Sequence, residues 1–220
     1  MGRLPRSLRS LAMTFVVFGT IEHMDTLDLT FENIGQITNL LKNGKIGVMP
    51  TDTIYGIVGS ALNPSVVEEI YKLRKRNIAK PMIILVFSLN DLKKFGIVLT
   101  NQQKDFLKKI WPNPVSVILP CPAEKFAYLH RGKKSLAFRI PKNEALLKIL
   151  ENAGPLVAPS ANSEKNKPAE TITEAKRYFG NDISFYVDGG KLKSKPSTIV
   201  QLYEDGKQIV LREGSFKLKV

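Results

Sequence analysis

Short apolar runs with strand character alternate with helical patterns along most of this chain, and this alternation limits its fold more than any other feature. The strand-like runs cover residues 45–49, 54–62, 83–87, 115–120, 135–140, 155–158, 184–188, 197–203 and 208–213. The helical patterns cover residues 32–43, 64–76, 91–95, 101–111, 145–154 and 172–180. Such alternation is typical of a single α/β domain, in which helices flank one sheet. The last strands follow one another too closely for helical crossovers, so we predict a twisted, mixed sheet of parallel and antiparallel strands.

A length of 220 residues favours one domain with a single core. Residues 1–23 differ from the rest, because Arg3, Arg6 and Arg9 precede a short apolar run, as in a targeting segment. That run is broken, no small-residue cleavage site is clear, and Met24 could itself begin a protein. We therefore treat residues 1–23 as an N-terminal extension, either targeting-like, an upstream start or a remnant of cloning, and predict one domain over residues 24–220.

Basic residues outnumber acidic residues, 33 to 20, which gives a formal net charge of +13. A positive potential of this kind attracts polyanions such as nucleotide phosphates and RNA, and charge alone does not separate the two. Hydrophobic residues make up 43% of the chain, close to the globular average, so composition favours neither a membrane protein nor a disordered one.

Several common catalytic and ligand-binding patterns are absent from the sequence. No stretch matches a P-loop, and no GxGxxG follows a predicted strand. A single cysteine, Cys121, excludes an intramolecular disulfide, a cysteine zinc cluster and a CxxC motif, and favours the reducing cytoplasm. We interpret Cys121 as a core thiol. His23 and His130 offer no metal pair and little support for a catalytic triad, and we expect His130 at the surface.

Two polar clusters adjoin the first predicted strands. In PTDTIYG, residues 50–56, the hydroxyls of Thr51, Thr53 and Tyr55 are suited to hold a small polar ligand, although a turn has the same composition. In RKRNIAKP, Arg74, Arg76 and Lys80 follow a predicted helix, and such groups bind phosphate through charged hydrogen bonds. A solvated helix end is the alternative for this basic run.

Two further clusters lie later in the chain. Ser160 and Asn162, in PSAN, directly follow an apolar strand, where open α/β sheets place their ligand sites. Ser197 and Thr198, in KPSTIV, and Arg212, in LREG, flank the last strands and are suited to close over a phosphate or a base. Turn or capping roles explain each cluster equally well when it is taken alone.

In their order along the chain, these clusters resemble the motifs of the YrdC family. The matching segments are GKIGVMPTDTIYG, RKRNIAKPMIILV, WPNPVSVILP, LAFRIP, PLVAPSAN, VDGG, PSTIV and LREG, from about residue 44 to residue 214. The resemblance implies a YrdC/RibB-like fold, in which a twisted α/β sheet carries a basic cavity. The chain ends just after LREG, so it resembles the short, single-domain members.

The resemblance implies a nucleotidyltransferase, an L-threonylcarbamoyladenylate synthase. Such an enzyme makes threonylcarbamoyl-AMP and pyrophosphate from L-threonine, bicarbonate and ATP, for the threonylcarbamoyladenosine modification of tRNA. We expect Mg²⁺ to enter with ATP and no tightly bound cofactor or protein metal site, because no carboxylate cluster is evident. The implied partners are a downstream threonylcarbamoyl-transferase complex and contacts with tRNA or RNA, with no membrane and a cytoplasmic location.

The resemblance also implies roles for single residues. Related proteins line the cavity with a KxR pair and an SxN pair, and the catalytic residues mapped from these pairs are Arg74, Arg76, Ser160 and Asn162. The implied ATP site consists of those four residues together with Lys80, Arg139, Ser197 and Arg212. The implied threonine site consists of Thr51, Thr53 and Tyr55.

Three segments depart from the family pattern. In WPNPVS, Asn113 and Ser116 stand where the family usually has glycine and threonine; asparagine tolerates the left-handed backbone that glycine often serves, and serine keeps the hydroxyl. Arg74 stands where the family has lysine, which keeps the charge and changes the hydrogen-bond geometry. SAN is followed by SEKNKP, which lacks the common serine–glycine pair.

The alternative function is RNA binding without catalysis. Against it, the basic runs are scattered and are not interleaved with aromatic residues. Related domains that act in carbamoyl transfer during hydrogenase maturation belong to much longer chains.

Overall fold

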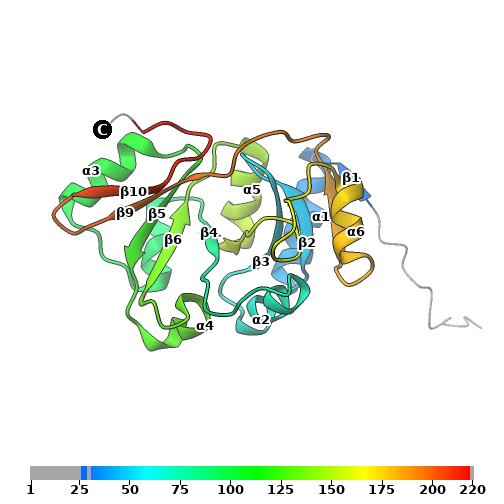
Figure 1. Ribbon diagram of the computed structural model, residues 1–220, viewed down its shortest axis with the longest axis horizontal. Coiled ribbons are helices and arrows are strands. Elements are labelled where there is room, and N and C mark those ends of the chain that lie inside the picture. The colour runs from blue at the N-terminus through cyan, green and yellow to red at the C-terminus, as the bar shows by residue number, and fades with distance from the viewer. Residues whose placement is uncertain (1–25, 29–30, 219–220) are drawn as a thin grey trace, which may run out of the picture.

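The computed structural model describes residues 26–28 and 31–218, so the predicted N-terminal extension lies outside the described residues (Figure 1). The strands are β1 (Thr26–Asp28), β2 (Gly47–Pro50), β3 (Tyr55–Ser60), β4 (Ile83–Leu85), β5 (Val115–Pro120), β6 (Ser135–Arg139), β7 (Leu156–Val157), β8 (Phe185–Asp188), β9 (Thr198–Leu202) and β10 (Gln208–Arg212). The α-helices are α1 (Phe31–Lys42), α2 (Pro64–Leu73), α3 (Asn101–Ile110), α4 (Ala127–His130), α5 (Glu144–Ala153) and α6 (Ile172–Phe179). Two 3₁₀ helices, η1 (Leu89–Phe95) and η2 (Glu124–Phe126), complete the described elements.

The strands form one sheet in the order β1-β8-β2-β3-β7-β4-β6-β5-β9-β10. The sheet contains parallel pairs, such as β2 with β8 and β5 with β9, and antiparallel pairs, such as β2 with β3 and β9 with β10. The prediction of a twisted, mixed sheet flanked by helices is therefore confirmed (Figure 1). The close spacing of the last strands does produce the antiparallel hairpin of β9 and β10.

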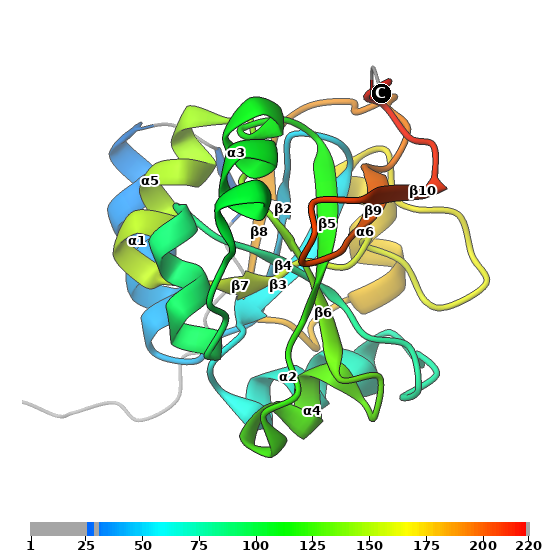
Figure 2. The ribbon, with the colours of Figure 1, turned by 90° about the vertical axis from the view of Figure 1, so that its left-hand side faces the viewer.

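Helices cover both faces of the sheet. Successive side chains of a strand point to opposite faces, so each central strand contributes to two cores. Val48 of β2 and Ile57 of β3 belong to the core that α2, α3 and α6 complete. Met49 and Val58, one residue further along, belong to the core that α1 and α5 complete. Figure 2 shows α1 and α5 side by side, away from α6. This two-sided burial explains why the central strands read as continuous apolar runs.

The helix α2 begins as its sequence predicts and carries the site's basic residues at its other end. The Asn63 side chain accepts hydrogen bonds from the Ser65 and Val66 amides, and Pro64 occupies the first turn. After Leu73 the chain leaves the helix, and Lys75 adopts a left-handed conformation with φ of 49°. The basic run therefore bends away from the helix axis toward the start of β4.

Three expectations differ from the structure. The short helix expected at residues 91–95 is a 3₁₀ helix that starts at Leu89, and β1 and α4 were not anticipated. The expectation that His130 lies at the surface is wrong, because its side chain is buried and its Nδ1 accepts the Gly132 amide hydrogen. A single histidine in a polar segment gives no periodic signal for burial. Cys121 is a buried core thiol, as expected.

Candidate functional site

One pocket collects most of the predicted site residues from both halves of the sheet. It has a volume of about 200 Å³. The turn between β2 and β3, the segment after α2, the ends of β6, β7 and β10, and the start of β9 all border it. The predicted residues that line it are Thr51, Thr53, Tyr55, Arg76, Arg139, Ser160, Ser197 and Arg212. Arg74, Lys80 and Asn162 are not part of this lining, and they lie in the network beside it.

The turn between β2 and β3 presents two buried threonine hydroxyls. The Thr51 and Thr53 Oγ1 atoms lie 3.1 Å apart, and the Thr51 hydroxyl donates to the Ile54 carbonyl at 2.7 Å. The Thr53 amide donates to Thr51 Oγ1, which closes the turn. The Thr53 hydroxyl is thus held in place by local bonds while it lines the pocket. A small polar ligand meets a fixed hydroxyl at this point.

Asp52, in the same turn, forms a buried ion pair that the sequence prediction missed. One of its carboxylate oxygens lies 3.0 Å from an amino nitrogen of Arg139, and both side chains are less than 5% exposed. The other oxygen accepts the Lys142 amide hydrogen at 3.1 Å. Burial lowers the pKa of Arg139, and the Asp52 charge opposes that change. The ion pair fixes the Arg139 guanidinium at the pocket wall.

Tyr55 borders the pocket, and its phenol oxygen is engaged elsewhere. The hydroxyl donates to the Gly190 carbonyl at 2.7 Å and lies 3.2 Å from an Asp188 carboxylate oxygen. The same oxygen accepts the Gly189 amide hydrogen at 2.9 Å. Burial raises the pKa of this phenol, with Asp188 adding to the effect, so it stays neutral at physiological pH. Tyr55 therefore anchors the loop after β8 to the strand that follows the threonine turn.

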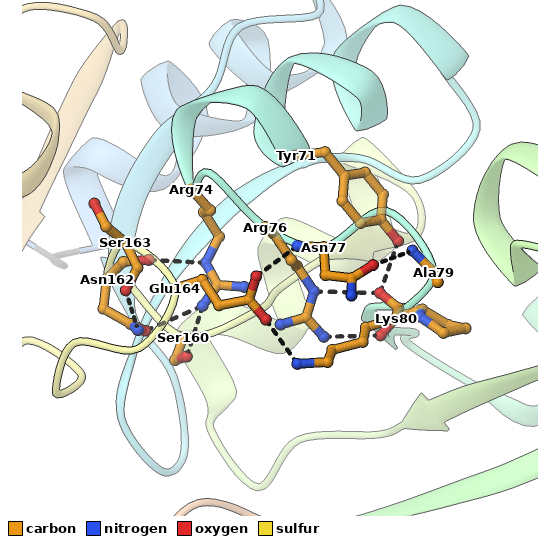
Figure 3. A network of polar contacts seen from close by, with 11 residues as sticks. Tyr71, Arg74, Arg76, Asn77, Ala79, Lys80, Ser160, Asn162, Ser163 and Glu164 are labelled. Atoms are coloured by element: carbon orange, nitrogen blue, oxygen red, sulfur yellow. Dashed lines mark hydrogen bonds and ion pairs between the residues drawn. The ribbon is translucent and has the colours of Figure 1, made fainter.

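Arg74 forms hydrogen bonds with both residues of the SxN pair, Ser160 and Asn162. Its Nε donates to the Asn162 carbonyl at 3.0 Å, and one amino group donates to Ser160 Oγ and to Asn162 Oδ1, both at 3.1 Å (Figure 3). The Asn162 amide group donates to two carbonyls of its own loop, those of Ser163 and Asn166. The Arg74 side chain is 2% exposed, and burial together with Arg76 lowers its pKa to about 10. It remains charged at neutral pH and orients Ser160, which does line the pocket.

The next basic residues lie at the pocket and its rim. Arg76 lines the pocket, is half-buried, and donates to the Lys80 and Pro81 carbonyls. Lys80 pairs with Glu164 at 2.7 Å, and Glu164 also accepts the Asn77 amide hydrogen (Figure 3). Glu164 in turn donates its own amide hydrogen to the Arg74 carbonyl at 2.8 Å. The loop after the SxN pair is thus attached to the segment after α2.

The opposite wall comes from the C-terminal hairpin. Ser197 Oγ lies 2.9 Å from the buried Ser116 hydroxyl, and Arg212 donates through two nitrogens to the Ser197 carbonyl. Gly214 packs so closely on this segment that an added Cβ would lie 2.1 Å from the Pro196 carbonyl oxygen. Only glycine fits there, which explains the glycine of LREG.

The pocket is strongly cationic and contains no obvious proton-transfer group. Three arginines, Arg76, Arg139 and Arg212, line it, and of these Arg139 is paired with a carboxylate. The described lining residues include no histidine, cysteine or carboxylate. Across the described part of the chain, no group of three His, Cys, Asp or Glu side chains could hold a metal ion, and no helix is long and apolar enough to cross a membrane. Such a pocket can bind an anion and stabilise developing negative charge.

Comparison with known proteins gives a consistent relationship. The family model for Sua5, YciO and YrdC proteins, described as telomere recombination, matches residues 39–214. A putative threonylcarbamoyl-AMP synthase of Methanocaldococcus jannaschii is 35% identical over 176 residues, which cover 78% of this chain and 81% of that protein. The threonylcarbamoyl-AMP synthase of Pyrococcus abyssi is 30% identical over 81% of this chain, and that of Photobacterium profundum is 26% identical over 83%. The chain spans 53% of the P. abyssi protein and all of the P. profundum protein.

Solved structures show the same relationship in three dimensions. P. abyssi Sua5 complexed with L-threonine superposes with a TM-score of 0.76 at 27% identity, over 83% of this chain and 54% of that one. Escherichia coli YciO superposes with a TM-score of 0.75 at 22% identity, over 90% of this chain and 95% of that one. The fold expectation is confirmed by both neighbours.

Proposed function

The chain belongs to the Sua5, YciO and YrdC family, and from this premise we propose that it is a threonylcarbamoyl-AMP synthase. The reaction joins L-threonine, bicarbonate and ATP, and it releases pyrophosphate and water. Relatives that match most of this chain carry this name, and one structural neighbour was solved with L-threonine. The observation that carries the proposal is the pocket, in which three arginines face fixed threonine and serine hydroxyls.

The chemistry needs positioning more than acid–base catalysis. The threonine amine and bicarbonate first give a carbamate and water. A carbamate oxygen then forms a bond to the α-phosphorus of ATP, while the bond from that phosphorus to the bridging oxygen of the β-phosphate breaks. No covalent enzyme intermediate forms, which agrees with a lining without histidine, cysteine or carboxylate.

The arginines of the pocket stabilise the charge of this reaction. We assign Arg76 and Arg212 to the phosphates and Arg139, held by Asp52, to the charge that develops at the α-phosphorus. Ser160 and Ser197 donate hydrogen bonds to the nucleotide. Arg74 and Asn162 act through Ser160 and the loop that carries it. Mg²⁺ enters as part of the ATP substrate, held by phosphate oxygens and water.

The threonine turn forms the other part of the site. We assign the amino acid and its carbamate to the Thr53 hydroxyl and the Thr51–Thr53 turn, next to the wall that Tyr55 builds. A polar pocket of fixed hydroxyls selects a hydroxylated amino acid, because an analogue without the hydroxyl leaves the buried Thr53 Oγ1 without the donor that it can accept. The phenol of Tyr55 contributes by holding the loop after β8.

The enzyme's product is an activated mixed anhydride, so a second enzyme must consume it. We propose a transferase that acts on tRNA as that partner, and a cytoplasmic location for both. The net charge of +13 is compatible with contact between this chain and RNA, which is part of the same proposal.

A pyrophosphate-release assay tests the synthase. Incubation with ATP, bicarbonate and L-threonine should release pyrophosphate, and omission of either threonine or bicarbonate should abolish the release. L-Valine in place of L-threonine is the matched control for the side-chain hydroxyl, because it keeps the shape. Absence of release, together with tight salt-sensitive RNA binding, would instead support the non-catalytic RNA-binding alternative.

A further inference from the structure

The Glu164 carboxylate binds to a set of groups suited to a phosphate. One of its oxygens pairs with the Lys80 ammonium at 2.7 Å, and the other accepts the Asn77 amide hydrogen. The Arg76 guanidinium is near enough to act on it electrostatically (Figure 3). An ammonium, a backbone amide and a guanidinium together are the donors that phosphate oxygens use. We define Asn77, Lys80 and Arg76 as the anion cradle.

The anion cradle adjoins the pocket. Arg76 belongs to both, because its side chain lines the pocket and acts on Glu164. Ser160, on the pocket wall, belongs to the same loop as Glu164 and is bonded to Arg74. A polyphosphate bound along this wall therefore reaches the cradle where the pocket ends. The Glu164 carboxylate occupies the Lys80 ammonium and the Asn77 amide, which are the donors nearest to the end of such a polyphosphate.

We propose that the Glu164 carboxylate competes with the terminal phosphates of the nucleotide for the donors of the anion cradle. By taking these donors back, it promotes the release of pyrophosphate. The inference rests on the proposed function for the identity of the ligand, a nucleotide polyphosphate. On binding, the Lys80 ammonium moves from the carboxylate to a phosphate oxygen. On release, the carboxylate takes back the ammonium and the Asn77 amide.

Burial and charge agree with this exchange. The Lys80 side chain is 60% exposed and can change partner, whereas the Glu164 side chain is 20% exposed and held by its loop. The hydrogen bond from Lys80, followed by that from Asn77, keeps the pKa of Glu164 below its ordinary value, so the competitor is charged at neutral pH. Glu164 belongs to the segment SEKNKP, which lacks the serine–glycine pair common in the family motif.

Calorimetric titration of the full chain with inorganic pyrophosphate tests the proposal. Glu164→Gln removes the charge and keeps the size, and Glu164→Ser removes the carboxylate altogether. We expect both variants to bind pyrophosphate about fivefold more tightly, the effect of removing one unit charge about 4 Å away in a water-like medium. Glu69→Gln is the matched control, because Glu69 forms an exposed ion pair with Lys72 on α2 and the change in net charge is the same.

The sign of the effect decides the matter. A purely structural role for Glu164 predicts weaker pyrophosphate binding in both variants, and this result, or one equal to that of Glu69→Gln, would overturn the proposal. In a Lys80→Met background the gain from Glu164→Gln should shrink, because Glu164 then competes for the Asn77 amide and not for the ammonium, and a gain of undiminished size would also count against the cradle. The titration needs neither threonine nor bicarbonate. A chain that shows the gain but no synthesis would therefore refute the proposed reaction alone.

Discussion

Replacing Arg74 with lysine tests whether this guanidinium supports the site or binds the ligand. The variant restores the residue that the YrdC motif usually has, in surroundings built for an arginine. Arg74 makes three hydrogen bonds, to the Asn162 carbonyl, to Asn162 Oδ1 and to Ser160 Oγ. A lysine ammonium at the end of an unbranched chain reaches one of these acceptors. Two charged hydrogen bonds are lost, and at about 1.5 kcal/mol each they amount to about 3 kcal/mol of unfolding free energy.

Urea unfolding at pH 7 and thermal melting measure this loss. For a chain of this size the loss corresponds to a fall in Tm of about 6–12 °C. We also expect slower pyrophosphate release, because Ser160 loses a partner that orients it. Arg76→Lys is the matched control. Arg76 is half-buried and donates hydrogen bonds to the Lys80 and Pro81 carbonyls, both in its own segment, so this variant should retain stability within about 1 kcal/mol and lose activity.

One result would refute the reasoning about Arg74. If Arg74→Lys keeps its unfolding free energy within about 0.5 kcal/mol of the parent and still loses pyrophosphate release, the guanidinium acts on the ligand. Its hydrogen bonds to the SxN pair would then be incidental. Such a result would return Arg74 to the phosphate-binding role that the family resemblance implies.

Three further predictions concern the pocket walls and the core. Asp52→Asn should cost about 3–5 kcal/mol in urea unfolding, because it leaves the buried Arg139 charge unpaired, and a cost below about 1 kcal/mol would contradict the ion pair. Gly214→Ala should cost about 1–3 kcal/mol and slow pyrophosphate release, since the new Cβ meets backbone atoms, whereas Gly35→Ala, with open space on α1, should stabilise by about 0.5–1 kcal/mol. Burial raises the pKa of Tyr186 to about 12 from 10.0, so its contribution is complete below pH 10 and is lost as the pH rises toward 12. The free energy of unfolding, from urea titrations, should fall over that range by about 2–3 kcal/mol, and Tyr186→Phe should reduce the fall; an equal fall in the variant would assign it to other groups.

The sequence predicted the architecture well because each signal was local. The apolar runs, the Asn63 cap and the close spacing of the last strands all act over a few residues, and the structure confirms them. The clusters at strand ends were predicted as site residues for the same reason, since strand ends meet at sheet edges. The prediction that these clusters converge on one pocket came from their ordered resemblance to a family and not from their spacing.

The directions of individual side chains were harder to predict. Arg74 follows the buried Val67 by seven residues and Ile70 by four, which places it on the covered face of α2, and this spacing was the available signal for its burial. Because its segment is rich in basic residues, the sequence predicted a ligand-binding or solvated residue at Arg74. Asp52 resembled turn chemistry, because its partner Arg139 lies far along the chain. The hydroxyl of Tyr55 donates to the Gly190 carbonyl in the loop after β8, and no local sequence pattern connects that loop to Tyr55.

The pocket's walls are contributed by segments that lie between residues 51 and 214, and Gly214 closes the last of them against Pro196. A ribosome therefore releases almost the whole domain before any nucleotide can be held. If ATP binds in this pocket, as proposed above, growing chains and fragments that lack one wall gain no stability from it, whereas a complete molecule is stabilised by mass action. Bound nucleotide would then protect complete molecules from proteases and leave truncated copies unprotected.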